Sequence, residues 1–183
     1  MKYEYRSMKM TLLSSFPLLV TVPVMMFLIL YNIRSVHNVG SIFRTADGAG
    51  VEKLHLIGMT PTPIDRFGRA RKDLAKVALG AEASVSWEYH KTISPLMQKL
   101  RKEGVGIVAV EQDPSSINYK KFAPYGSVAY IVGNEVDGIP KSILKKCDYI
   151  IEIPMQGKKE SLNVSVATGI ILFQVVSLHK EHQ

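Results

Sequence analysis

The sequence predicts an α/β fold, with a mostly parallel sheet flanked by helices. Short apolar runs rich in Val, Ile, Leu or Tyr alternate along the chain with segments of helical periodicity, which is typical of this class. The length of 183 residues, with 46% hydrophobic and 21% charged residues, fits one ordinary globular domain. Collagen-like, low-complexity and disordered classes are therefore excluded.

Six apolar runs are the expected strands of this sheet. They cover residues 26–31, 52–57, 84–87, 105–110, 127–132 and 149–153. Neither an internal repeat nor a linker interrupts them, so we expect one domain over residues 25–183, preceded by an apolar extension of unknown role at 1–24.

The helices are expected between these strands, where capping residues occur. Asn38 is expected to cap a helix that runs through Ala49 and ends at Gly50. The other predicted boundaries are a start at Ser94-Pro95 with an end at Gly104, and a short helix after Pro140.

The last helix has the clearest pattern and is expected to start around residues 161–163. Apolar residues recur along it at three- and four-residue steps, which predicts a stripe facing the core. The stripe consists of Val164, Ala167, Ile171, Val175 and Leu178, and the polar far end carries His179, Lys180 and His182.

The segment Thr11 to Tyr31 carries no charge and follows three basic residues, so it resembles a signal peptide or membrane span. Pro17 and Pro23 interrupt it, and a small-residue cleavage site is missing. We favour the alternative that residues 27–31 form the first buried strand, and we expect no membrane association. A membrane-tethered form is the alternative left open.

Charge and cysteine content narrow the choice of partner and compartment. The chain has 23 Lys and Arg against 16 Asp and Glu, a net charge of +7, which favours a polyanion such as nucleic acid or an acidic membrane surface. Cys147 is the lone cysteine, so an intramolecular disulfide cannot form and a cytoplasmic location is expected.

The spacing of residues argues against several common kinds of binding or active site. The G-x-G string at Gly104 follows a helix and runs along a strand, and the Gly133–Gly138 loop lacks the Lys-Ser/Thr of a phosphate loop. A G-x-S-x-G elbow is absent from the sequence. The five histidines show no metal-ligand spacing, so we expect no metal.

Three polar segments remain, each placed at the end of a predicted strand. In residues 32–47, the helix start near Asn38 offers backbone N–H groups and Arg44 follows nearly two turns later, an arrangement that suits an anion. The alternative is that Asn38 only caps the helix and Arg44 pairs with a surface carboxylate.

The other two segments carry a carboxylate and a hydroxyl–amide pair. Residues 131–140 place Glu135 between glycines, which lets the backbone approach a ligand closely, although an ordinary turn has the same pattern. Residues 151–167 bring Ser161 and Asn163 to a helix start after the basic pair Lys158-Lys159, and helix capping by Ser161 is the alternative.

In this order and spacing the three segments resemble the motifs of the SpoU-type (TrmH-like) RNA 2′-O-ribose methyltransferases, in the SPOUT or α/β-knot superfamily. The resemblance runs from about residue 26 to the C-terminus and includes the K-V-A-L-G-A-E stretch at 76–82. It implies a C-terminal trefoil knot over roughly residues 105–175 and a homodimer with an interfacial active site. It also implies S-adenosyl-L-methionine as methyl donor.

The resemblance further implies roles for individual residues. The methyl donor would be held by Val110, Gly133, Ile153, Ser161 and Leu162, and the reacting ribose would be surrounded by Asn38, Arg44, Glu135, Ser161 and Asn163. Because a guanidinium is effectively never deprotonated in proteins, we expect Arg44 to bind phosphate and stabilise the 2′-oxygen instead of acting as a base. Glu135 is expected to orient Arg44 or Asn38.

The RNA substrate is expected to be tRNA in preference to rRNA. A compact enzyme would bind RNA through a basic surface formed by Arg66, Arg69, Arg71, Lys72 and Lys76, although a solvated loop has the same composition. A non-catalytic RNA-binding relative with the same fold is the alternative function.

Overall fold

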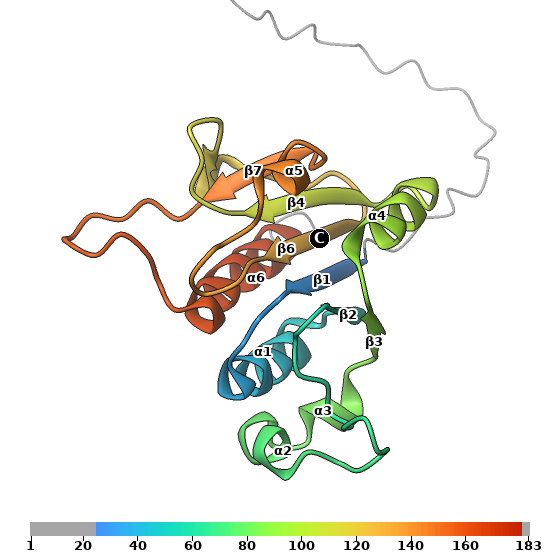
Figure 1. Cartoon of the computed structure of the whole chain (residues 1–183). Helices are drawn as coiled ribbons and strands as arrows, with labels where there is room; N and C mark the ends of the chain where they lie inside the picture. The colour runs from blue at the N-terminus through green and yellow to red at the C-terminus, as the bar shows by residue number, and fades with distance from the viewer. Residues whose placement is uncertain (1–24, 181–183) are drawn as a thin grey trace, which may run out of the picture.

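The computed structural model describes residues 25–180, with side chains up to residue 176, so the expected extension at 1–24 lies outside the described residues. Within this range one seven-stranded sheet has the strand order β3-β2-β1-β6-β4-β7-β5, and every pairing is parallel. The expected α/β fold with a parallel sheet flanked by helices is thereby confirmed (Figure 1).

The bounds of the elements follow the alternation of the sequence. The strands are β1 (Met26–Tyr31), β2 (Lys53–Ile57), β3 (Trp87–His90), β4 (Gly106–Val110), β5 (Ile117–Asn118), β6 (Val128–Val132) and β7 (Tyr149–Glu152). The helices are α1 (Val36–Ala49), α2 (Lys72–Ala78), α3 (Ala81–Ser84), α4 (Ile93–Lys102), α5 (Lys141–Leu144) and α6 (Val164–Lys180), with a 3-10 turn at Tyr119–Lys121.

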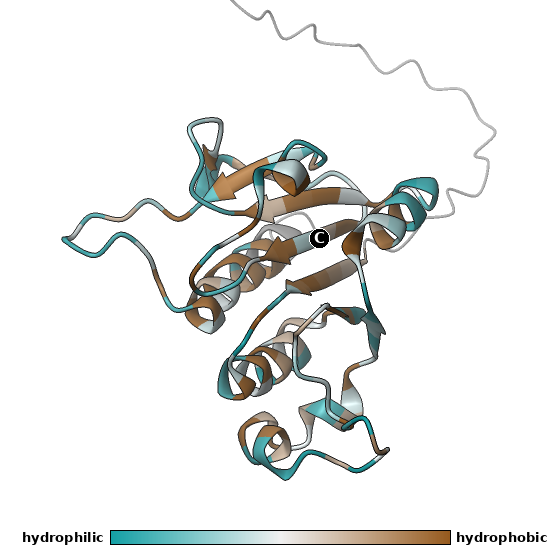
Figure 2. Ribbon diagram, in the orientation of Figure 1, coloured by the Kyte–Doolittle hydropathy of each residue, from teal (hydrophilic) through white to brown (hydrophobic). Residues whose placement is uncertain are grey.

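Helices cover both faces of the sheet and create two apolar layers. On one face, α1 and α6 pack against β1, β2 and β6, with Phe43 and Leu172 fully buried between them. On the other face, α4 and α5 cover β1, β4 and β6 through Leu96 and Leu144. Because both faces are covered, the central strands consist mainly of apolar residues, and β1 is largely brown in Figure 2.

β1 lies at the centre of the sheet, between β2 and β6. Its residues Leu28 to Leu30 are 0–1% exposed, so this part of the apolar segment is a buried strand, as we expected. Residues 11–24 of the uncharged segment lie outside the described residues. Among the described residues, none of the helices has both the length and the hydropathy needed to cross a membrane.

Three local predictions were wrong. The strand expected at 84–87 lies at Trp87–His90, because Ser84 ends α3, and the strand carries polar residues on one face at the sheet edge. The cap of α1 is Ser35 and not Asn38: the Ser35 hydroxyl oxygen accepts the backbone N–H of Asn38 at 3.3 Å. The third error concerns two histidines and is described with the site. Gly50, with φ of 69°, ends α1 as expected.

Candidate active site

The site lies where the carboxyl ends of β1 and β6 meet, since neighbouring parallel strands end at the same edge of a sheet. Asn32 and Arg34 follow β1, and Asn134 and Glu135 follow β6. Hydrogen bonds between these two turns fix their relative position.

Glu135 binds the turn between β1 and α1 through three donors. One carboxylate oxygen accepts the backbone N–H of Arg34 at 3.0 Å, and the other accepts the N–H of Ser35 at 3.2 Å. The Asn38 side-chain amide donates to that second oxygen at 2.9 Å. Because Ser35 caps the helix, the Asn38 side chain is available for this contact.

Asn163 brings the third polar segment to the same point. Its side-chain nitrogen donates to the side-chain oxygen of Asn38 at 3.1 Å. The side-chain oxygen of Asn163 accepts the backbone N–H and the hydroxyl of Ser165. The latter contacts place Asn163 at the start of α6, where we had considered Ser161 as the cap. Asn38, Glu135 and Asn163, from three separate segments, thus form one hydrogen-bonded chain.

The carboxylate of Glu135 is held in its charged form. Partial burial by itself would raise the pKa of Glu135, but the hydrogen bonds from the Arg34 backbone and the Asn38 side chain outweigh it and lower the pKa below its usual range. Glu135 is therefore an orienting anion at neutral pH and has no proton to donate.

Sequence reasoning missed three polar residues that build this edge. The Asn134 side chain donates to the backbone carbonyl of Asn32 at 2.8 Å, and the side-chain oxygen of Asn32 (Oδ1) accepts the backbone N–H of Met59 at 3.1 Å. Glu111, after β4, accepts the N–H of Ile139 at 2.8 Å and so joins the turns after β4 and β6. A strand end followed by Asn or Glu is the signal that could have identified them.

A cleft of about 440 Å³ opens beside this chain of polar groups, between the turns after β4 and β6 and the start of α6. A smaller hollow of about 110 Å³ adjoins it near the end of β7. Four of the five residues predicted to hold the methyl donor line these spaces through side chains, Val110, Ile153, Ser161 and Leu162, and Gly133 contributes backbone. The cleft also borders Glu135 and Asn163.

Arg44 is the one predicted ribose-binding residue that lies away from this cluster. It is exposed on α1, roughly 9 Å along the helix axis from Asn38 and about a third of a turn around it. Arg44 does not line the cleft. Within one chain, the structure therefore brings together Asn38, Glu135, Ser161 and Asn163 without Arg44.

Known proteins show the family to which the chain belongs. A family model described as the SpoU rRNA Methylase family matches residues 25–173. The chain belongs to this family. A curated relative, the 23S rRNA (guanosine-2'-O-)-methyltransferase RlmB of Escherichia coli, is 36% identical over 149 residues, which are 81% of this chain and 58% of the relative. The SpoU domain described here thus spans less than two thirds of that protein.

Solved structures of similar proteins share the fold. An AdoMet-bound rRNA methyltransferase from Sinorhizobium meliloti has a TM-score of 0.76 and 27% identity, over 85% of this chain and 56% of its own. The TrmH/SpoU tRNA modifying enzyme of A. aeolicus has a TM-score of 0.75 and 28% identity, over 86% of this chain and 76% of its own. The SpoU family therefore accounts for both the sequence motifs and the sheet order.

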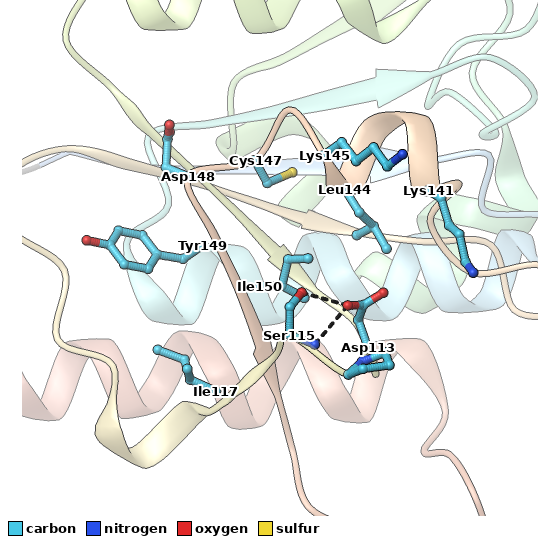
Figure 3. Close-up of a pocket in the computed structure, with 11 residues that line it drawn as sticks. Asp113, Ser115, Ile117, Lys141, Leu144, Lys145, Cys147, Asp148, Tyr149 and Ile150 are labelled. Carbon is cyan, nitrogen blue, oxygen red and sulfur yellow. Dashed lines mark hydrogen bonds between the residues drawn. The ribbon is translucent and has the colours of Figure 1, made fainter.

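A second large pocket, of about 540 Å³, lies elsewhere, between α5 and the segment after β4 (Figure 3). None of the predicted site residues lines it. Asp113 accepts the backbone N–H and hydroxyl of Ser115 there, at 2.9 and 2.6 Å. Burial, aided by Asp148, raises the pKa of Cys147 to about 11, so this thiol is a poor nucleophile at neutral pH.

The expectation that the histidines do not cluster was wrong for two of them. His55 on β2 and His90 on β3 approach each other, with Nδ1 of His55 3.0 Å from Nε2 of His90, and Glu88 lies beside them. Burial and the neighbouring His90 lower the pKa of His55 to about 4, so the pair is neutral at pH 7. The register of β2 with β3 creates this contact, and the sequence does not reveal that register.

Proposed function

We propose that the chain is an S-adenosyl-L-methionine-dependent RNA methyltransferase that methylates a ribose 2′-hydroxyl. The observation that carries the proposal is the hydrogen-bonded chain of Asn38, Glu135 and Asn163 beside the cleft of about 440 Å³. This cleft falls within the range of roughly 300–1,000 Å³ that small-molecule sites occupy. Three motif segments that are distant in sequence thus meet where a methyl donor and a sugar could meet.

The residues of the cleft fit S-adenosyl-L-methionine. Val110, Ile153 and Leu162 would offer apolar contacts to the adenine base and the carbon chain of the methyl donor, while Ser161 offers a hydroxyl. At Gly133, a Cβ atom would lie 2.5 Å from the backbone of Gly138, so glycine is required for the tight turn that forms one wall. The relative from Sinorhizobium meliloti, described as AdoMet bound, supports this choice of cofactor.

The chemistry asks the protein for alignment and charge stabilisation. The donor supplies a methyl group on a sulfonium; the O–CH₃ bond forms as the S–CH₃ bond breaks, and the 2′-hydroxyl loses its proton. Asn38 and Asn163 hold the sugar by hydrogen bonds, and Glu135 fixes Asn38. Phosphate or water takes the proton, because Glu135 is already engaged by three donors.

Arg44 completes the site from the second subunit of a homodimer. Arg44 does not line the cleft of its own chain, so a second copy is the proposed source, and the exposed apolar residues Leu162, Val166 and Phe173 at and along α6 offer a surface for that contact. Arg44 binds the phosphate beside the target ribose and stabilises charge that develops on the 2′-oxygen.

The C-terminal part of the fold is a trefoil knot, as the superfamily resemblance implies. Two contacts support it: Glu111 accepts the N–H of Ile139, and the Gln112 side chain donates to the carbonyl of Glu160, so the turn after β4 contacts the turns after β6 and β7. A crystal structure that traces residues 105–175 without a knot would contradict this part of the proposal.

RNA is the substrate class that the basic charge and the relatives support. The curated relative acts on 23S rRNA and the A. aeolicus protein on tRNA, so both RNAs are tested. We expect 2′-O-methyl mapping of total RNA, incubated with the full chain and S-adenosyl-L-methionine, to show a new modified ribose in tRNA or rRNA. Calorimetry is expected to show binding of the methyl donor.

The Asn163→Ala variant is the control for this experiment, because it removes the side chain that contacts Asn38. Binding of RNA without binding of the methyl donor would favour the non-catalytic relative. A wild-type chain that leaves every ribose unchanged, while the donor binds, would contradict the proposed reaction.

A further inference from the structure

A third surface stands out between the end of β2 and the start of α2. It is a hollow of about 810 Å³ whose wall includes Phe67, Tyr89, Trp87, Arg66 and Arg71. Phe67 is 65% exposed and Tyr89 is 48% exposed, although large aromatic side chains are normally covered. The proposed reaction assigns no role to these two aromatic residues.

The loop that carries Phe67 is ordered by its own hydrogen bonds. The Asp65 carboxylate accepts the N–H of Phe67 at 2.8 Å and the N–H of Arg69 at 3.0 Å, and Ile64 bridges Ala70 in antiparallel fashion. The Arg69 guanidinium pairs with Asp65 at 2.8 Å. These contacts fix the backbone of Phe67 and hold its side chain outward, so the exposed ring is part of a preformed turn.

Basic groups surround the ring. The guanidinium carbons of Arg66 and Arg69 lie 4.8 and 5.0 Å from the centre of the Phe67 ring. Residues 65–76 hold five basic side chains, Arg66, Arg69, Arg71, Lys72 and Lys76, against two acids, Asp65 and Asp73. Both acids already bind arginines of the same segment, and Arg66 forms no ion pair among the described residues. Aromatic and guanidinium groups together are what proteins use to bind unstacked bases and their phosphates.

The loop is tied directly to the catalytic edge. The backbone N–H of Ile33 donates to the Thr60 hydroxyl oxygen at 3.1 Å, and the N–H of Met59 donates to Asn32 at 3.1 Å. Asn32 is also the residue that Asn134 binds. The segment after β2, which forms one wall of the hollow, therefore starts beside the turn that Glu135 binds, while Trp87 and Tyr89 of β3 line the hollow as well.

We propose that this hollow binds an unpaired base of the RNA substrate, next to the ribose that is methylated. The inference rests on the proposed function and adds the substrate class: RNA with a single-stranded segment or loop at the target. Phe67 and Tyr89 contact the base, and Arg66 contacts the adjoining phosphate. Perfectly paired RNA cannot present such a base, so the site selects against duplex.

Binding of a short single-stranded oligoribonucleotide of mixed sequence to the full chain tests the proposal. We expect Phe67→Ala to weaken binding roughly 5- to 100-fold, the effect of losing one stacked base, and Phe67→Trp to retain it. Tyr125→Ala is the matched control, because Tyr125 is also an exposed aromatic residue but precedes β6, whereas the segment with Phe67 follows β2, so the two lie toward opposite ends of the parallel strands. Its affinity is expected to equal that of the wild type.

Three outcomes would overturn the inference, and each is distinct from a failure of the proposed function. One is equal affinity of Phe67→Ala and wild type for the single strand. A second is that Phe67→Ala loses as much affinity for the matching duplex as for the single strand. The third is a change of oligomeric state in Phe67→Ala, which would make the hollow a contact between copies of the chain. Calorimetry with S-adenosyl-L-methionine is expected to be unchanged in every variant, and loss of donor binding by the wild type would instead contradict the proposed function.

Discussion

Glu135 shows how one side chain can join two turns and position a third residue. Its carboxylate binds two backbone N–H groups of the turn after β1 and the side chain of Asn38. A neutral side chain of the same shape offers only one acceptor atom and introduces two donors. The position of Asn38 therefore depends on the negative charge of residue 135.

We expect Glu135→Gln to lower kcat for RNA methylation roughly 10- to 100-fold, since hydrogen bonds to charged groups contribute about 1.5–3 kcal/mol. Binding of S-adenosyl-L-methionine should change little, because the cleft walls formed by Val110 and Leu162 remain. Asp137→Asn is the control: it makes the same change of charge at an exposed position of the same loop. Equal losses in the two variants would show that local charge, and not the hydrogen bonds of Glu135, matters.

At the scale of elements, close contact between α1 and α2 depends on a glycine. A Cβ atom at Gly40 would lie 2.8 Å from the Cβ of Val77 and 3.0 Å from the carbonyl oxygen of Leu74. A Cβ atom at Gly48, on the same helix, would meet its nearest neighbour at 3.7 Å, an ordinary contact. The two glycines of α1 therefore differ in what an alanine would do.

Gly40→Ala is expected to destabilise the protein by about 1–3 kcal/mol, because α2 must move away. Gly48→Ala is expected to stabilise it by roughly 0.5–1 kcal/mol, because alanine loses less backbone entropy in a helix. Urea unfolding of the two variants measures both values. An unaffected Gly40→Ala would mean that α1 and α2 are spaced differently, and a destabilised Gly48→Ala would mean the same for α1 and α6.

The contact of β2 with β3 has a consequence for stability at acid pH. Burial, together with His90, Lys53 and Lys99, lowers the pKa of His55 to about 4 against an ordinary value of 6.5, while Glu88 acts in the opposite direction. Between these pH values the unfolded chain takes up a proton that the folded chain does not. The folded state therefore loses stability as the pH falls from 6.5 to 4, by roughly 3 kcal/mol.

Urea unfolding at a series of pH values measures this loss. In His55→Leu we expect the stability to fall less over the same window, whereas His37→Asn, a change at an exposed histidine, should follow the wild type. Parallel curves for wild type and His55→Leu would show that His55 takes up its proton equally easily in both states.

The elements that the sequence predicts well are those buried on both faces. β1, β4 and β6 consist mainly of apolar residues, because helices cover both sides. β3 lies at an edge and alternates Trp87 and Tyr89 with Glu88 and His90, so its pattern does not stand out from a loop. β5 has only two residues. The start of α1 was misplaced because Ser35 and Asn38 are both good capping residues.

The same limit applies to the site. The proximity of Asn38 and Glu135 requires β1 and β6 to be neighbours in a parallel sheet, and the sequence predicts parallel strands but not this order. Which atoms meet depends on the register of the strands and on individual dihedral angles. One example is the φ of 53° at Asn32, whose side-chain oxygen accepts the N–H of Met59. Neither the register nor these dihedral angles can be predicted from the neighbouring residues in the sequence.

For the whole molecule, the decisive question is where Arg44 acts. One chain supplies Asn38, Glu135, Ser161 and Asn163 at one edge of the sheet, with Arg44 exposed on another face of α1. A homodimer in which each site receives Arg44 from the other copy resolves this separation. Such an arrangement makes activity depend on association of the chains.

Complementation between two inactive variants tests that arrangement. Arg44→Ala and Asn163→Ala are each expected to lose nearly all activity alone. If the two residues serve one site from different subunits, a mixed dimer carries one site with both defects and one intact site, so an equal mixture recovers about a quarter of wild-type activity after exchange of subunits. If both residues come from the same chain, every site in the mixture keeps one defect and activity stays near zero. Mixing Arg44→Ala with Arg44→Lys, which repairs no site in either case, measures the background.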